Sequence, residues 1–175
     1  MRINLWAGAG AGKSTIASGC FYDLKCMGYN VELVREYIKA WAYENKKPKS
    51  FDQIYVFAKQ LRAEDHLLQH GISHIVTDSP IKMQVFYARR YNFPCWEQLY
   101  EIADRFEELY PAINVFLSRE GLEYKDDGRY EREAEARKVD REILDYMDRF
   151  VGDYKIFPSV NLTAITNHVI EQINR

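Results

Sequence analysis

The sequence predicts an α/β fold, a parallel sheet of about five strands with helices on both faces. Short apolar runs alternate with longer amphipathic segments along the 175 residues, and this alternation is typical of a parallel sheet. A glycine-rich turn ending in Lys-Ser-Thr follows the first apolar run, and a strongly charged stretch follows the fourth. A chain of this length is too short for two ordinary domains. We therefore expect one domain spanning 1–175.

Each element is expected from its apolar period and from the residues that end it. A brief apolar run stopped by glycine, proline or a polar turn indicates a strand, and apolar residues recurring near the helical period indicate a helix. The strands are expected at 3–6, 31–34, 72–77, 112–117 and 154–158, and the helices at 14–27, 35–45, 51–69, 83–91, 96–109, within 119–148 and at 163–173.

Composition narrows the class of protein. A formal net charge of −2 argues against a surface that binds polyanions over its whole extent, although a local basic groove stays open. The three cysteines form no C-x-x-C pair, so a disulfide framework or a zinc site is not expected. The sequence shows no apolar stretch of membrane-spanning length and no secretory leader at Met1. We expect a cytoplasmic protein that does not bind membranes.

The glycine-rich turn is the strongest functional signal. It lies between an expected strand and an expected helix, where a phosphate-binding loop would be placed. Glycines let the backbone turn its N–H groups toward phosphates, and the helix adds the positive end of its dipole. The lysine should reach the β- and γ-phosphates of ATP, and the serine should hold Mg²⁺. The predicted loop consists of Gly8, Ala9, Gly10, Ala11, Gly12, Lys13, Ser14 and Thr15.

One position departs from the strict pattern G-x-x-x-x-G-K-[ST]. The pattern would place glycine where this chain has Ala7. Alanine is the smallest replacement, and Gly8 and Gly10 lie beside it. The alternative interpretation is a glycine-rich turn without a ligand, but the Lys-Ser-Thr ending and the flanking elements favour a P-loop. The predicted fold is therefore that of the P-loop NTPases and kinases.

The rest of the chain favours a kinase among P-loop proteins. A GTPase would be expected to carry an Asn-Lys-x-Asp guanine reader, which the sequence lacks. Glu36 follows the second strand, where a carboxylate could accept a proton from the acceptor hydroxyl and orient it. Asp78 follows the third strand and is a candidate for holding Mg²⁺ or a substrate hydroxyl. The structural alternatives are a glutamate at a helix N-terminus and a helix cap.

The charged stretch over about 119–148 is expected to form an arginine-rich lid. Arg129, Arg132 and Arg137 follow the hinge candidate Gly128. Guanidinium groups closing over the triphosphate would stabilise charge during phosphoryl transfer, and Arg129 and Arg132 are the catalytic candidates. The alternative is a solvated helix face, on which these arginines pair with neighbouring glutamates.

Several motifs resemble the AAA_28-type small P-loop kinases. The motifs are Leu33 to Tyr37, the helix with Gln53, Asp78-Ser79-Pro80 and Tyr124 to Arg129, and they cover nearly the whole chain. That family includes nicotinamide riboside kinase domains and bacteriophage P-loop kinases, some of which phosphorylate hydroxymethyluracil bases in DNA. The resemblance implies a kinase in a bacterial or bacteriophage-infected cell.

A looser similarity connects the chain to the deoxyribonucleoside kinases. Glu36 with Trp41 five residues later, and Phe51-Asp52-Gln53 on the next helix, are similar to that family. The similarity implies that Glu36 is the base and that Gln53 reads a nucleobase edge, with Trp41 at the acceptor. The alternative for Gln53 is an exposed helix residue. The third-strand motif is Asp-Ser-Pro, not the Glu-Arg-Ser of nucleoside kinases.

The acceptor therefore stays open between a nucleoside, a nucleotide, nicotinamide riboside and a hydroxymethylated base in DNA. Aromatic residues in the acceptor-side segments could stack a base or belong to the core. Lys46, Lys47, Lys49, Arg89 and Arg90 are the basic groups that could guide a DNA strand. A protein of another class, an ATPase switch that hydrolyses nucleotide with a protein or nucleic-acid partner, is the competing hypothesis. A homodimer is a further expectation.

Overall fold

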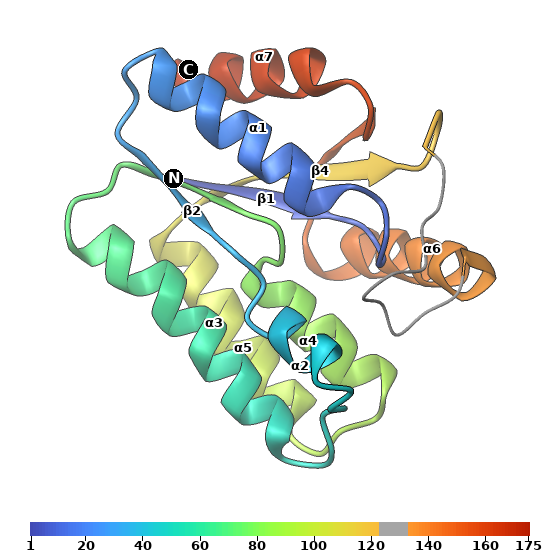
Figure 1. Ribbon diagram of the computed structural model, residues 1–175. Coiled ribbons are helices and arrows are strands. Elements are labelled where there is room, and N and C mark those ends of the chain that lie inside the picture. Colours follow the sequence, from blue (N-terminus) through green and yellow to red (C-terminus); the bar gives the residue numbers. More distant parts are fainter. Residues whose placement is uncertain (123–132) are drawn as a thin grey trace.

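A five-stranded parallel sheet forms the centre of the computed structural model, which describes residues 1–122 and 133–175 (Figure 1). The strand order is β2-β3-β1-β4-β5, and every neighbouring pair is parallel. The predicted α/β fold with about five parallel strands is confirmed. The strands are β1 Arg2–Trp6, β2 Val31–Val34, β3 His74–Thr77, β4 Ala112–Ser118 and β5 Lys155–Pro158.

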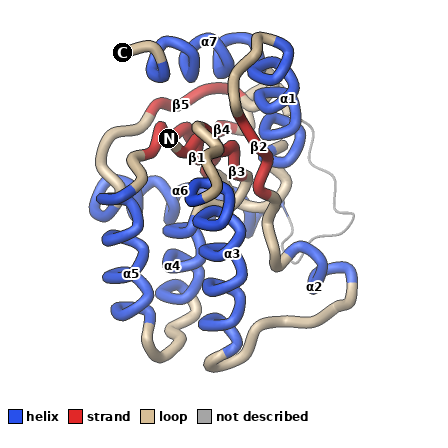
Figure 2. Tube along the Cα trace, turned by 90° about the vertical axis from the view of Figure 1, so that its left-hand side faces the viewer, coloured by secondary structure: helices blue, strands red, loops and turns tan. Residues whose placement is uncertain are grey.

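Helices cover both faces of the sheet, as a parallel sheet requires. Helices α1 and α7 lie together on one face, and α3, α4, α5 and α6 lie on the other (Figures 1 and 2). The short α2 projects beside the end of α3. The helices are α1 Lys13–Cys26, α2 Lys39–Tyr43, α3 Asp52–Gln69, α4 Ile81–Arg90, α5 Trp96–Leu109, α6 Glu133–Phe150 and α7 Leu162–Ile173.

The side chains of strand β1 point alternately to the two faces of the sheet and so contribute to two separate parts of the core. Ile3 and Leu5 pack into the apolar layer formed with α1 and α7. Trp6 packs on the opposite face against residues of α4 and α6. Because successive side chains of a strand point to opposite faces, Arg2 and Asn4 share the face of Trp6. Both are fully buried there.

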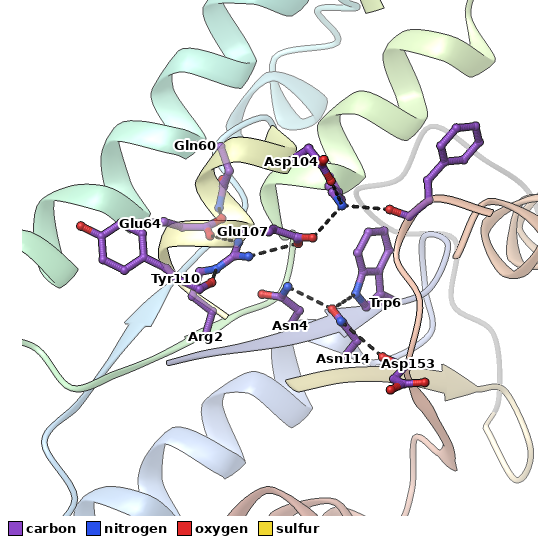
Figure 3. A network of polar contacts seen from close by, with 12 residues as sticks. Arg2, Asn4, Trp6, Gln60, Glu64, Asp104, Glu107, Tyr110, Asn114 and Asp153 are labelled. Carbon is purple, nitrogen blue, oxygen red and sulfur yellow. Dashed lines mark hydrogen bonds and ion pairs between the residues drawn. The ribbon is translucent and has the colours of Figure 1, made fainter. Parts of the chain in front are cut away.

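These buried polar groups belong to a network beneath the sheet (Figure 3). The Arg2 guanidinium forms ion pairs with Glu64 of α3 at 3.3 Å and Glu107 of α5 at 3.1 Å, and its Nε donates to the Tyr110 carbonyl at 2.8 Å. Glu107 also pairs with Lys82 of α4 at 2.7 Å. The network therefore links β1 to three helices of this face.

The expected helix over 35–45 is wrong in its first turn. The helix begins at Lys39, because the preceding backbone bonds to distant side chains. The Glu36 N–H donates to Asp78 at 2.7 Å, and the Tyr37 N–H donates to Gln60 at 3.3 Å. These two bonds hold 35–38 as a loop over the end of the sheet.

Smaller differences lie at other boundaries. Strand β3 begins at His74 rather than at residue 72, because the Ile72 N–H closes the end of α3 on the Leu67 carbonyl. Helix α4 begins at Ile81, two residues before the expected start, with Pro80 at its N-cap. Within residues 1–122 and 133–175, no helix combines the length and apolar character needed to cross a membrane.

Candidate functional site

The candidate site lies where the parallel strands end at their carboxyl edge. The loop at 8–12 follows β1, Glu36 follows β2, Asp78 follows β3 and Arg119 follows β4. Strands β2, β3, β1 and β4 are neighbours in this order, so their following residues are brought to one edge of the sheet. In parallel α/β folds this edge is where ligands bind.

The loop after β1 has the conformation expected of a phosphate-binding turn. Gly10 and Gly12 have φ of 78° and 80°, a left-handed region that favours glycine. The Lys13 ammonium donates to the carbonyls of Ala7 at 2.7 Å and Gly8 at 3.0 Å, so the side chain lies back across the loop. Helix α1 begins at Lys13 and directs its N-terminal end at the loop.

Ala7, which replaces the first glycine of the pattern, is fully buried and belongs to the apolar layer beneath α1. Its methyl group therefore packs in the core. The glycine that the fold requires is Gly8. A Cβ at Gly8 would lie 2.8 Å from Asp140 Oδ1 and 2.9 Å from the Ala136 carbonyl oxygen, so no side chain fits there.

Asp78 connects the loop to Glu36. Its Oδ2 accepts from the Ser14 hydroxyl at 2.5 Å, and its Oδ1 accepts from the Glu36 N–H at 2.7 Å. The interpretation of Asp78 as a helix cap is wrong, because Pro80 is the N-cap of α4 and α4 has no side-chain cap. Asp78 thus links Ser14, in the first turn of α1, to Glu36 in the loop after β2.

Glu36 lies in a mixed electrostatic environment. Burial raises the pKa of its carboxyl group above the ordinary value, and the nearby Asp78 adds to this. Lys13, Lys39 and a hydrogen bond from Ser79 oppose that increase in pKa. Ser79 Oγ lies 3.5 Å from Glu36 Oε1, so it can orient the carboxylate. Glu36 precedes α2 by three residues and is not part of its first turn.

The residues around Ser14 fit a magnesium ion bound together with a triphosphate. A hydroxyl and a carboxylate are the hard oxygen ligands that Mg²⁺ prefers, and Mg²⁺ usually takes its other ligands from phosphates and water. Lys39 Nζ lies 3.2 Å from the Ser14 hydroxyl and adds positive charge. Among the described residues, no group of three His, Cys, Asp or Glu side chains forms a metal cage. Ser14 and Asp78 would therefore hold the ion with its phosphate ligands.

Gln53 is buried rather than exposed, so the alternative of a solvent-facing helix residue is wrong. Its side-chain amide donates to the Gln84 backbone carbonyl at 3.1 Å and to Gln84 Oε1 at 3.4 Å. Gln84 Nε2 in turn donates to Ser79 Oγ at 2.9 Å. These bonds form a buried polar chain from α3 to Glu36. Gln84 is part of it although no motif in the sequence marks this residue.

Trp41 lies on α2, five residues after Glu36 in the chain. Its ring stacks on Tyr55 of α3 with centroids 6.3 Å apart, and Tyr55 meets the ring of Tyr37 at 5.7 Å. Tyr55 is half exposed, and Lys59 lies over its ring at 5.4 Å. The three aromatic residues pack on one another, Tyr37 directly follows Glu36 in the chain, and none of the three is buried.

Other predicted basic residues are placed differently. Arg129, Arg132 and the segment around Gly128 lie outside the described residues. Arg137 is exposed on α6 and pairs with Glu133 one turn earlier, as a solvated helix face would. Arg90 forms ion pairs with Glu135 and Glu142 of α6, and Arg89 lies over Trp96 and Phe150. Arg89 and Arg90 therefore hold α4, α5 and α6 together.

Two contacts of the loop were not predicted. Asp140 of α6 accepts from the Gly8 N–H at 2.7 Å, and Arg119 donates to the Ala9 carbonyl at 2.7 Å. Arg119 and Asp140 also pair with each other at 2.5 Å. The sequence carries no local signal for these contacts, because Asp140 lies 132 positions from Gly8.

The fold and this edge of the sheet define a P-loop NTPase-type domain. The family model of AAA_28, described as an AAA domain, matches residues 2–164. The chain therefore belongs to the AAA_28 family. Among solved structures it is similar to a deoxyadenosine kinase from M. mycoides with bound dATP, at 18% identity and a TM-score of 0.60 over 100% of both chains. That likeness shows the same fold. No curated protein sequence matches the chain.

Proposed function

We propose that this protein is an ATP-dependent kinase that transfers the γ-phosphate to a hydroxyl group of a nucleoside- or nucleotide-type acceptor. The observation that carries the proposal is the chain of contacts from Ser14 through Asp78 to Glu36. These contacts hold the Glu36 backbone near the phosphate loop, and the charges of Lys13 and Asp78 act on its partly buried carboxylate. A carboxylate in this polar, partly enclosed position can orient an acceptor hydroxyl toward the γ-phosphorus.

The roles follow from position. The loop backbone from Ala9 to Gly12 and the N-terminal end of α1 would bind the phosphates, and Lys13 would leave the loop carbonyls for the β- and γ-phosphates. Bound Mg²⁺ would neutralise phosphate charge. Glu36 would accept a hydrogen bond from the acceptor hydroxyl and align its oxygen with the γ-phosphorus. It would take the proton as the new P–O bond forms, while the bond from the γ-phosphorus to the β–γ bridging oxygen breaks and ADP leaves.

The surroundings of Glu36 support an acceptor that contains a base. Tyr37, Trp41 and Tyr55 present aromatic faces on which a base could stack. Gln53 and Gln84 add buried amide groups on the inner side. Within residues 39–59 the side chains of Lys39, Lys46, Lys47, Lys49 and Lys59 are exposed, and this positive charge would favour a phosphate-bearing acceptor. A hydroxymethylated pyrimidine in bacteriophage DNA, such as 5-hydroxymethyluracil, is thus included among the acceptors that we propose.

A panel assay tests the proposal. Purified protein would be incubated with labelled ATP and Mg²⁺ and with nucleosides, nucleotides, nicotinamide riboside or DNA containing 5-hydroxymethyluracil. Transfer of label to one acceptor class, with ADP released in equal amount, is the expected result. ADP release without any labelled acceptor, increased by a protein or by unmodified nucleic acid, would instead establish an ATPase switch and contradict the kinase proposal.

A further inference from the structure

The loop that follows β1 is held from outside by two side chains that come from distant parts of the chain. Asp140 Oδ1 accepts from the Gly8 N–H at 2.7 Å, and Arg119 Nη2 donates to the Ala9 carbonyl at 2.7 Å. The Arg119 Nε donates to Asp140 Oδ2 at 2.5 Å. Both side chains are largely buried, with 5% of Arg119 and 14% of Asp140 exposed.

We infer that Arg119 and Asp140 are positioning residues that fix the first turn of the phosphate loop for nucleotide binding. The inference rests on the proposed function, because it takes a nucleotide as the ligand of the loop. It adds two residues to the site and assigns a role to α6, whose Asp140 lies far from the loop motif in the sequence.

The reason lies in the directions of the backbone groups. A phosphate-binding loop must present N–H groups to the anion and keep its carbonyl oxygens away from it. Lys13 holds the carbonyls of Ala7 and Gly8, and Arg119 holds that of Ala9. Before nucleotide binds, three consecutive carbonyls therefore face cations, and Arg119 can still hold the Ala9 carbonyl once Lys13 moves to the phosphates. The bond from Gly8 N–H to Asp140 fixes the rotation of the peptide that enters the loop.

The charge of the pair also suits this role. Asp140 alone would repel the phosphates, and Arg119 beside it neutralises that charge. Paired, each orients the other, and charge-assisted hydrogen bonds of this kind are stronger than neutral ones. The close packing of α6 on Gly8 supports a fixed loop, because a Cβ there would also lie 3.2 Å from Arg119 Nη2.

The test measures ATP affinity by calorimetry, which needs no acceptor. Asp140→Ala and Arg119→Ala should each weaken ATP binding by roughly 10- to 100-fold, the range for losing a hydrogen bond to a charged group. Asp140→Asn keeps an oxygen that can accept from the Gly8 N–H, so it should lose less ATP affinity than Asp140→Ala. Arg119→Lys should lose affinity as well, because one ammonium group lacks the fork that serves both Asp140 and Ala9.

The double variant Arg119→Ala/Asp140→Ala should lose about as much ATP affinity as the weaker-binding single variant, because the two residues act as a unit. Arg141→Ala and Asp145→Ala are matched controls, since both residues are exposed on α6. These controls should bind ATP as the wild type does. Circular dichroism and thermal melting would establish that each variant is folded.

Hydrogen exchange of the Gly8 amide, measured by NMR without nucleotide, separates this inference from the proposed function. Exchange should accelerate in Asp140→Ala and to a smaller degree in Asp140→Asn. If the alanine variants do not fold, the ATP affinity and the Gly8 amide exchange of Asp140→Asn and Arg119→Lys test the inference in their place. Unchanged ATP affinity and unchanged Gly8 exchange in folded variants would overturn the inference. A wild-type protein that binds no ATP would instead overturn the proposed function.

Discussion

Glu36 is the residue whose replacement best separates a kinase from a nucleotide-driven switch. Glu36→Gln keeps the size and the hydrogen-bonding reach of the side chain but removes its charge and most of its basicity. Transfer to the acceptor should fall by roughly 10²–10⁴-fold, the usual contribution of a positioned acid–base group. ATP affinity should change little, because Lys13, Ser14 and the loop backbone are untouched. Steady-state kinetics with the acceptor found in the panel assay, together with ATP calorimetry, would measure both quantities.

A loss of ATP binding in Glu36→Gln would contradict the assignment of Glu36 to the acceptor. The carboxylate would then act on the nucleotide or its metal ion, and Asp78 would become the better candidate for the base. Ser79→Ala is a useful companion variant, because Ser79 Oγ contacts Glu36 Oε1 at 3.5 Å without contacting the loop. It should reduce transfer less than Glu36→Gln does.

The cysteines give a second prediction at this scale. Burial raises the pKa of the Cys20 thiol to about 11, and Cys20 is fully enclosed between α1 and α7. Because the thiolate is the reactive form, Cys20 should resist thiol reagents at pH 8 in the native protein. Cys26 is exposed and should react rapidly. Mass spectrometry after timed labelling, with a denatured control, would check this. Equal rates for both cysteines in the native state would contradict it.

At the residue scale, the sequence predicts the parts of the site that are local in the chain. The loop from Gly8 to Thr15 is recognisable because its residues are contiguous and their spacing matches the phosphate-loop pattern. Glu36 and Asp78 are predictable because they follow strands. Asp140 and Gln84 are not, because each lies inside a helix and acquires its role from a partner brought near by the fold.

At the scale of elements, the Arg2 network joins β1 to α3, α4 and α5 (Figure 3). Arg2→Ala would leave the buried carboxylate of Glu64 without its cation. Breaking a buried ion pair in this way typically costs about 3–5 kcal/mol. We expect a loss of that order in the free energy of unfolding, measured by urea denaturation. The contribution is large because neither side chain is exposed.

Lys25→Ala is the control for this experiment. Lys25 pairs with Glu32 at 2.8 Å, but both side chains are about two-fifths exposed. Exposed pairs contribute about 0–1 kcal/mol, so this variant should unfold nearly as the wild type does. Similar losses in the two variants would contradict the importance that we assign to the buried network.

Most helices and strands were predictable at this scale, because their periodic apolar pattern extends over many residues or their ends carry glycine or proline. The first turn of the expected helix at 35–45 was not. Its backbone N–H groups at Glu36 and Tyr37 bond to Asp78 and Gln60 instead of to a helix. Such tertiary hydrogen bonds override the helical propensity of a short segment. They cannot be predicted from the sequence, because they do not change the pattern of apolar residues.

At the scale of the whole molecule, ligand binding and stability are linked. A ligand that binds the folded state alone stabilises it by about 2.7 kcal/mol at a concentration 100 times its dissociation constant. For a chain of this size, 1 kcal/mol corresponds to about 2–4 °C in melting temperature. MgATP at that concentration should therefore raise the melting temperature by roughly 5–11 °C. Differential scanning calorimetry would measure the shift.

The variant Lys13→Ala tests whether the stabilisation by MgATP comes from binding at the loop after β1. The ammonium group contacts the loop carbonyls of Ala7 and Gly8 and touches none of the apolar core, so the variant should melt close to the wild type without ligand. It should lose most of the MgATP shift, because the charge that binds the β- and γ-phosphates is gone. AMP, which lacks those phosphates, should stabilise the wild type far less than MgATP does. An equal shift with AMP, or a full shift in Lys13→Ala, would mean that the nucleotide binds elsewhere than at the loop after β1.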